Sequence, residues 1–276
     1  MAGVLKVLAV LALGYAALVL LAWRFQERIA FPAPRGPLPN PADRGLPDGE
    51  RVRVSTSDGV ELAGWFLPPA QPLAPGARAP ALIWLYGNAE TMGDLAPIVR
   101  DLRPPATALL ILDYRGYGVS GGQPTEAGLY RDALAAWEFL LRRPDVDPDR
   151  IAVYGRSLGS VPALYLATER PVCAVVLDSP FTSAREMARR HYRLIPPFVL
   201  RLSMDNLERA RRLDAPLLVL AGTADGIVPF DMGRRIAEAA AGEMVAIEGA
   251  GHNDLYAAAG ARYRFELHRF LDHHLR

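Results

Sequence analysis

The chain has 276 residues, of which 51% are hydrophobic and 22% charged, and this composition excludes wholesale disorder. Lys and Arg (31) nearly balance Asp and Glu (30), so the chain lacks the basic excess that drives binding to a phosphate backbone. The single cysteine, Cys173, excludes an intramolecular disulfide framework and a multi-cysteine metal site. We therefore expect a globular protein without a metal or a nucleic-acid partner.

The N-terminal segment 7–23 is apolar and uncharged, with Lys6 before it and Arg24 after it. Its length is about the minimum for a tilted helix that spans a bilayer. A cleaved signal peptide is an alternative, but such peptides have shorter apolar runs and end at small residues, unlike Leu21-Ala22-Trp23. A buried core helix is a third interpretation. We predict a single-pass transmembrane anchor within residues 1–30.

The rest of the chain divides into a proline-rich stretch and an alternating region. Residues 31–49 show no helical period, which predicts an extended linker. From residue 50 to 276, aliphatic runs alternate with amphipathic stretches, which predicts a mostly parallel sheet flanked by helices. The expected strands are Val52–Ser55, Leu62–Leu67, Ala81–Tyr86, Ala108–Asp113, Ile151–Tyr154, Ala174–Leu177, Leu217–Ala221 and Met244–Ile247. The expected helices are Thr91–Leu102, Thr125–Arg143, Leu158–Glu169, Asp231–Ala240 and Tyr263–His273.

Two features modify this alternation. Asp58-Gly59 lies between the first two strands and is a hairpin signal, so the sheet is expected to open with an antiparallel pair. The segment 182–214 is helical in pattern, rich in arginine, and apolar around Pro196-Pro197. An insertion of this length between strands is typical of a cap over a site, so we predict a small helical cap there.

The pattern Gly-x-Ser-x-Gly occurs twice, at 118–122 and 155–159, and its context must show which serine is reactive. A nucleophile elbow needs a buried strand before the serine and a helix after it, because the strained turn lifts the hydroxyl above the sheet. Ser157 has both, whereas Ser120 lies several residues beyond its strand and is followed by Gln123-Pro124. The context favours Ser157 as nucleophile, with a helix N-cap as its structural alternative.

A general base and an acid are expected after the nucleophile. Among the five histidines, His252 alone follows an expected strand, whereas His191 lies in the arginine-rich cap and the others lie near the C-terminus. Asp225 follows the seventh strand and can fix one imidazole nitrogen, which leaves the other free to take the serine proton. Asp178, after the sixth strand, is the alternative acid. We predict Ser157, His252 and Asp225 as a catalytic triad.

Acyl transfer also needs N–H donors for the charge that develops on the carbonyl oxygen. One is the backbone N–H of Leu158, the residue after the nucleophile. The other is expected in the loop after the third strand, where we prefer Asn88 and keep Ala89 as the near alternative. A plain turn at Gly87-Asn88 is the competing interpretation of this loop.

From about Val52 to the C-terminus the sequence resembles the α/β-hydrolase superfamily. The motifs that carry the resemblance are Tyr86-Gly87-Asn88-Ala89, Asp113-Tyr114-Arg115-Gly116-Tyr117-Gly118, Gly155-Arg156-Ser157-Leu158-Gly159, Asp178-Ser179-Pro180-Phe181, Gly222-Thr223-Ala224-Asp225 and Gly251-His252-Asn253-Asp254. More narrowly, the chain resembles single-pass α/β-hydrolase-domain proteins that include protein depalmitoylases and serine-aminopeptidase-like hydrolases of bacteria. The resemblance implies the same triad. Tyr86 departs from the usual histidine of this group, which puts the hydrogen-bond support of its loop in doubt.

These patterns together predict a membrane-anchored serine hydrolase that cleaves carboxylic ester or thioester bonds through an acyl-enzyme, without a cofactor or metal. The expected substrate is a small-molecule or lipid-derived acyl compound. An aminoacyl peptidase of the same fold and a non-catalytic scaffold are the alternatives. Arg24, Arg28 and Arg35 follow the apolar segment, which leans toward the cytoplasmic face of a bacterial inner membrane for the folded domain.

Overall fold

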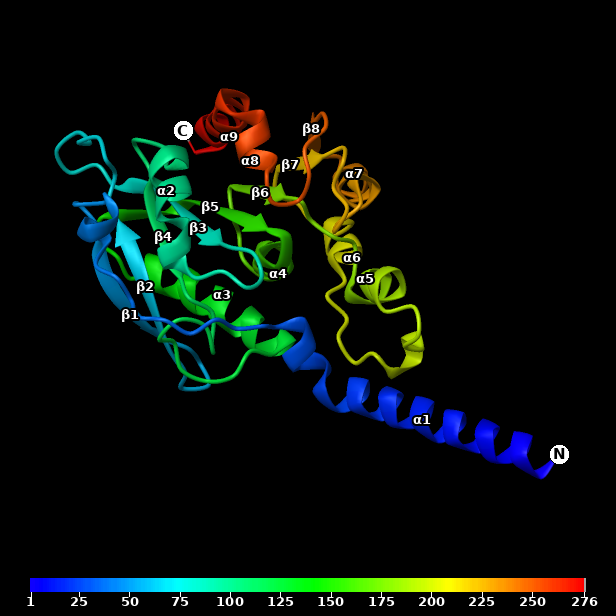
Figure 1. The fold of residues 1–276 in the computed structure, drawn as a ribbon. Coiled ribbons are helices and arrows are strands. Elements are labelled where there is room, and N and C mark those ends of the chain that lie inside the picture. Colours follow the sequence, from blue (N-terminus) through cyan, green and yellow to red (C-terminus); the bar gives the residue numbers. More distant parts are fainter. Residues whose placement is uncertain (276) are drawn as a thin grey trace.

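A computed structural model describes residues 1–275 and contains one eight-stranded sheet in the order β1-β2-β4-β3-β5-β6-β7-β8 (Figure 1). The strands are β1 (Glu50–Ser55), β2 (Glu61–Leu67), β3 (Ala79–Leu85), β4 (Ala108–Leu112), β5 (Val146–Arg156), β6 (Ala174–Asp178), β7 (Leu217–Gly222) and β8 (Glu243–Ile247). Every expected strand forms, and β3, β4, β6 and β7 are buried along their whole length. Burial on both faces explains their uninterrupted apolar runs.

The sheet opens with the expected antiparallel pair of β1 and β2, joined at a turn where Gly59 has a φ of 79°. β2 is also antiparallel to β4, and all the remaining neighbours are parallel. The carboxyl ends of parallel strands meet at one edge of a sheet. The loops after β3, β5, β7 and β8 therefore open on the same side.

Helices cover both faces of the sheet, which confirms the predicted fold class (Figure 1). The five expected helices are α2 (Met92–Leu102), α3 (Glu126–Leu141), α4 (Ser160–Glu169), α7 (Phe230–Ala239) and α9 (Ala261–His274). α2 packs against α9, and α3 packs against α4. A further short helix, α8 (Leu255–Ala259), follows β8 and had no counterpart in the predicted elements.

The proline-rich stretch 31–49 contains only a short 3-10 helix, Pro41–Arg44. It differs from the expected free linker because it packs along the domain. Phe31 is buried in the core, and the indole N–H of Trp65 donates a hydrogen bond of 3.1 Å to the carbonyl of Pro39. The proline content of this stretch predicted that it forms no long helix. Its packing against the domain was not predictable, because it depends on single residues that contact strands distant in the sequence.

The helix α1 (Ala2–Ala30) projects away from the sheet (Figure 1). It is long and apolar enough to cross a membrane, and no residue of its apolar window is buried. Its last turns differ from the rest, because Gln26 is buried and contacts the domain. By length and composition alone, such a helix fits a membrane anchor or a signal sequence.

The segment 182–214 lies between β6 and β7 and contains α5 (Ala184–His191), a 3-10 turn at Pro197–Val199 and α6 (Asn206–Ala210). The loop between α5 and α6 lies beside α1 (Figure 1), and the hydroxyl of Tyr15 donates a hydrogen bond of 3.0 Å to the carbonyl of Leu194. This segment, termed the cap below, therefore contacts both the domain and the N-terminal helix.

Candidate active site

Ser157 lies in a sharp turn between β5 and α4, where its φ of 49° is unusual for a residue other than glycine. Two glycines make this turn possible. A Cβ atom on Gly155 would lie 2.6 Å from the carbonyl oxygen of Gly159, and one on Gly159 would overlap the backbone of Leu85 in β3. The turn thus requires the small residues on either side of the serine, and it raises the hydroxyl at the carboxyl edge of the sheet.

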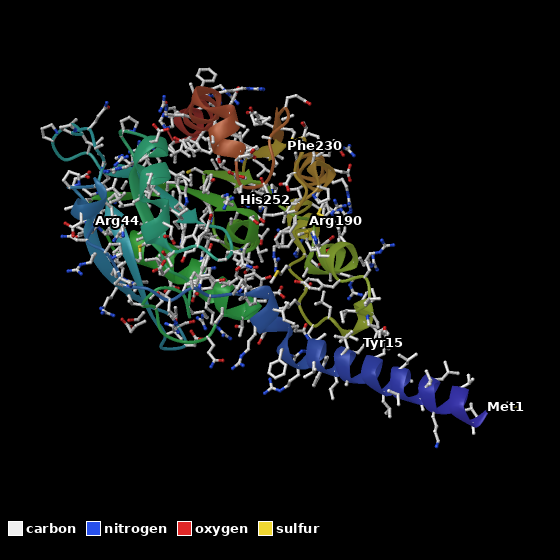
Figure 2. The ribbon with its side chains drawn as sticks, viewed as in Figure 1. Met1, Tyr15, Arg44, Arg190, Phe230 and His252 are labelled. Carbon is white, nitrogen blue, oxygen red and sulfur yellow. The ribbon has the colours of Figure 1, made fainter. Side chains whose placement is uncertain are left out.

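Three side chains from separate loops meet at this edge. His252, after β8, places Nε2 3.0 Å from Oγ of Ser157, and its Nδ1 lies 2.7 Å from Oδ2 of Asp225, after β7. The other carboxylate oxygen of Asp225 accepts the backbone N–H groups of Ile227 and Val228, both at 2.8 Å. The Asp225 carboxylate is consequently fixed, and it holds Nδ1 of His252 as the protonated nitrogen. Figure 2 shows His252 on the side of the sheet that faces the cap.

The alternative acid and the cap histidine have other partners. Oδ2 of Asp178 accepts hydrogen bonds from the hydroxyls of Tyr154 (3.2 Å) and Tyr263 (2.6 Å). His191 bonds through Nε2 to the carbonyl of Ile227 at 2.9 Å. Among residues 1–275, His252 alone hydrogen-bonds the Ser157 hydroxyl.

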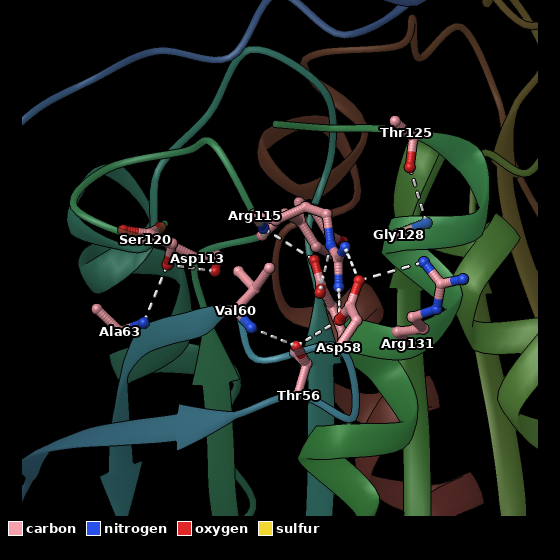
Figure 3. Close-up of polar contacts among 12 residues, drawn as sticks. Thr56, Asp58, Val60, Ala63, Asp113, Arg115, Ser120, Thr125, Gly128 and Arg131 are labelled. Carbon is pink, nitrogen blue, oxygen red and sulfur yellow. Dashed lines mark hydrogen bonds and ion pairs between the residues drawn. The ribbon is translucent and has the colours of Figure 1, made fainter. Parts of the chain in front are cut away.

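Ser120, in the first Gly-x-Ser-x-Gly, is fully buried (Figure 3). Its Oγ donates to the carbonyl of Asp113 at 2.7 Å and accepts the backbone N–H of Ala63 at 2.9 Å. The first bond closes the loop after β4 on itself, and the second ties this loop to β2. Ser120 therefore has the surroundings of a structural residue.

Asn88 and Leu158 line the cavity beside Ser157. The backbone N–H of Asn88 makes no hydrogen bond to another backbone group among residues 1–275. The N–H of Ala89 is already bonded to Oδ1 of Asn88 at 3.1 Å, which makes it the weaker donor. The N–H of Asn88 is therefore available to an incoming oxygen, and the second predicted donor, the N–H of Leu158, lies in the turn directly after Ser157. The predicted role of the Asn88 and Leu158 N–H groups, to stabilise an oxyanion, rests on their position beside the nucleophile and its cavity.

A tyrosine cluster supports the Asn88 loop in place of the histidine that the sequence lacks. The hydroxyl of Tyr86 donates to Oδ1 of Asp113 at 2.8 Å, and the hydroxyl of Tyr114 donates to the carbonyl of Tyr86, also at 2.8 Å. Burial and the neighbouring Asp113 charge raise the pKa of Tyr86, so its hydroxyl stays protonated as a donor. Tyr117 donates to Oδ1 of Asn88 at 2.7 Å. The loop therefore has firm hydrogen-bond support.

Arg156 was not among the predicted site residues, yet it joins two loops of the site. Its guanidinium lies 2.6 Å from the carboxylate of Glu90 in the Asn88 loop and donates a 3.1 Å hydrogen bond to the carbonyl of His252. Burial alone would lower the pKa of Arg156, but the charges of Asp178 and Glu90 raise it, so the guanidinium stays cationic. The one sequence signal that could have identified Arg156 as a site residue is its position directly before Ser157.

A cavity of about 420 Å³ adjoins Ser157 and His252. Its wall is mostly apolar, and the cap supplies Met187, Tyr192, Ile195, Val199 and Leu200. Among residues 1–275, Glu90 is the one carboxylate on this wall, and it is paired with Arg156. The cavity is thus suited to an apolar group that ends at a polar reaction centre.

Comparison with known proteins shows which family the chain resembles in sequence and in fold. Residues 77–205 match the family model Hydrolase_4, described as serine aminopeptidase, S33. The uncharacterized protein Rv2307c of Mycobacterium tuberculosis is 39% identical over 272 residues, which cover 97% of this chain and 94% of that protein. Human alpha/beta hydrolase domain-containing protein 17C is 36% identical over 205 residues, which cover 73% of this chain and 60% of that protein.

Among solved structures, the Pyrococcus furiosus esterase Pf2001 superposes with a TM-score of 0.73 at 21% identity, covering 88% of this chain and 99% of that one. At this identity the likeness concerns the fold. The chain belongs to the α/β-hydrolase superfamily, and its residues 77–205 match the serine aminopeptidase S33 family within it.

Proposed function

We propose that the protein is a membrane-anchored serine hydrolase that cleaves carboxylic ester or thioester bonds through an acyl-enzyme. The observation that carries the proposal is the continuous hydrogen-bond chain from Ser157 through His252 to Asp225, beside a cavity that Asn88 and Leu158 also line. This arrangement supports nucleophilic acyl transfer by a serine.

The reaction needs water as its one co-reactant. His252 Nε2 accepts the proton of Ser157 as Oγ attacks the acyl carbon, and the imidazolium is stabilised by the Asp225 carboxylate. The negative charge on the carbonyl oxygen is received by the N–H groups of Asn88 and Leu158. The imidazolium then protonates the leaving alcohol or thiol. Water, deprotonated by His252, attacks the acyl carbon, and the imidazolium returns the proton to Oγ of Ser157 as the bond to Oγ breaks and the acid leaves.

Esters and thioesters are favoured over aminoacyl amides because of the charges in the cavity. An aminopeptidase must bind an α-ammonium group, which calls for an unpaired carboxylate near the nucleophile. Within residues 1–275, the carboxylate on the cavity wall is Glu90, and Arg156 already neutralises it. The apolar wall is better matched to an acyl chain.

Retention of α1 as an anchor is supported by its continuity. The helix runs without a break through Trp23 to Ala30, and its apolar window ends in Leu21-Ala22-Trp23, which lacks the small-x-small pattern of a signal-peptide cleavage site. Beyond that window, Gln26 is buried against the cap and Ala30 is hydrogen-bonded to Asn88. The charge pattern leans toward a cytoplasmic location of the domain.

The test is a substrate panel on the full-length protein in detergent, with p-nitrophenyl esters of several chain lengths, acyl thioesters and aminoacyl p-nitroanilides. We expect turnover of esters and thioesters that disappears in Ser157→Ala. A preference for aminoacyl anilides would instead support a peptidase. The absence of turnover in a folded wild-type protein would support a scaffold without catalysis.

A further inference from the structure

The last turns of α1 form part of the cavity wall. Ala22, Gln26, Ile29 and Ala30 border the same cavity as Ser157 and His252. Their spacing of four, three and one residues places them on one face of a helix. The helix that serves as the proposed anchor thus also faces the nucleophile, across the space where a substrate would lie.

Hydrogen bonds fix this wall on two sides. Oε1 of Gln26 accepts the backbone N–H groups of Arg201 (2.7 Å) and Leu202 (3.4 Å) in the cap, and Gln26 is buried. On the other side, Nδ2 of Asn88 donates a 2.7 Å hydrogen bond to the carbonyl of Ala30. The end of α1 is therefore attached both to the cap and to the loop that offers the Asn88 N–H.

The cap beside this wall exposes apolar side chains where α1 is itself apolar. Leu194 is 72% exposed and Phe198 is 84% exposed, and the carbonyl of Leu194 is bonded to Tyr15, within the apolar part of the helix (Figure 2). Apolar side chains exposed beside the apolar part of α1 are favourable in a bilayer and unfavourable in water. Arg189 and Arg190 precede these residues, in the last turn of α5, and cations of this kind suit anionic lipid headgroups.

From these contacts we propose that α1 is a wall of the acyl-binding site, and that the cavity takes the acyl chain of a membrane-lipid ester or thioester from the bilayer. The inference rests on the proposed hydrolase function. The chain would lie between α1 and the cap, with its carbonyl carbon at Ser157. Each additional methylene buried there is expected to raise kcat/KM about fourfold until the cavity is filled.

The test compares p-nitrophenyl dodecanoate with p-nitrophenyl acetate, using the full-length protein in nanodiscs. Ala22→Trp and Ile29→Trp place a large ring on the cavity wall and are expected to lower the dodecanoate-to-acetate ratio of kcat/KM at least about tenfold. Leu21→Trp is the matched control, because Leu21 neighbours Ala22 but is exposed away from the cavity. In this control the ratio should stay within about twofold.

The outcomes separate the two proposals. An unchanged ratio in both wall variants would overturn the role of α1 while leaving the hydrolase assignment intact. An equal loss on both esters would also overturn it, because the helix would then support the fold without selecting the chain. If wild type cleaves neither these esters nor the acyl thioesters of the substrate panel, the hydrolase proposal itself fails, and the inference that rests on it fails too.

Discussion

The chain carries Gly-x-Ser-x-Gly twice, and the two serines have opposite surroundings. Ser157 has a φ of 49° and directs its hydroxyl to His252, whereas Ser120 is fully buried with its hydroxyl bonded to backbone groups. The residues around Ser120 serve the same structural purpose. Arg115 forms ion pairs of 2.8 Å with Asp132 in α3 and with Asp58. The pair with Asp58 connects the loop after β4 to the turn between β1 and β2 (Figure 3).

The difference lies in what the backbone does before and after the serine. At Ser157 a buried strand runs directly into the turn and a helix leaves it, so the hydroxyl is presented above the sheet edge. At Ser120 the loop turns back, and its glycines allow the return: Gly118 and Gly122 have φ values of 50° and 72°. The same five-residue pattern thus builds the candidate nucleophile turn in one place and a packed loop in the other.

The largest effect on activity is expected when the Ser157 hydroxyl is removed. Ser157→Ala removes the nucleophile and is expected to lower kcat by about 10⁶-fold, with little change in the thermal midpoint. Esterase assays combined with thermal unfolding would check both quantities. Substantial residual kcat in Ser157→Ala would contradict the assignment of the nucleophile.

The acid can be tested at the two aspartates that the sequence offered. Asp225→Asn keeps an oxygen for the N–H groups of Ile227 and Val228 but presents an amide to His252, which favours the wrong tautomer. We expect kcat to fall about 10⁴-fold. The matched variant Asp178→Asn should act mainly on stability, because its partners are buried tyrosine hydroxyls. The opposite ranking of the two kcat values would reassign the acid.

Removing the guanidinium that joins the two site loops should have an intermediate effect. Arg156→Met breaks the contacts with Glu90 and the His252 carbonyl, so both loops lose their alignment with the serine. A displacement of this kind is expected to reduce kcat/KM by about 10²-fold. Arg156→Lys, which keeps the charge, should recover part of the loss. Equal activity in Met, Lys and wild type would show that the link is not needed.

The smallest effect on catalysis is expected at the first pattern. Ser120→Ala leaves the N–H of Ala63 and the carbonyl of Asp113 without their buried partner, which should lower the free energy of unfolding by about 1–3 kcal/mol. Chemical denaturation measures that loss. Activity per folded molecule should stay within about twofold, and a larger drop would mean that Ser120 contributes to the reaction.

Much of the fold was predictable because its signals are local. The runs that became β3, β4, β6 and β7 are apolar since both faces of those strands are covered, and the candidate site residues lie on loops that follow strands. Contacts between distant segments were not predictable. They include the burial of Phe31, the link made by Arg156, and the approach of α1 to the cavity. None of these leaves a periodic pattern in the sequence.

The most direct measurement is labelling with a fluorophosphonate probe, followed by peptide mapping of the modified residue. The account predicts one adduct, on the peptide that contains Ser157, and none on the peptide that contains Ser120. It also predicts that Ser157→Ala abolishes labelling while Ser120→Ala preserves it in the folded protein. An adduct on Ser120, or labelling that persists in Ser157→Ala, would contradict the central claim that the second pattern alone supplies the nucleophile.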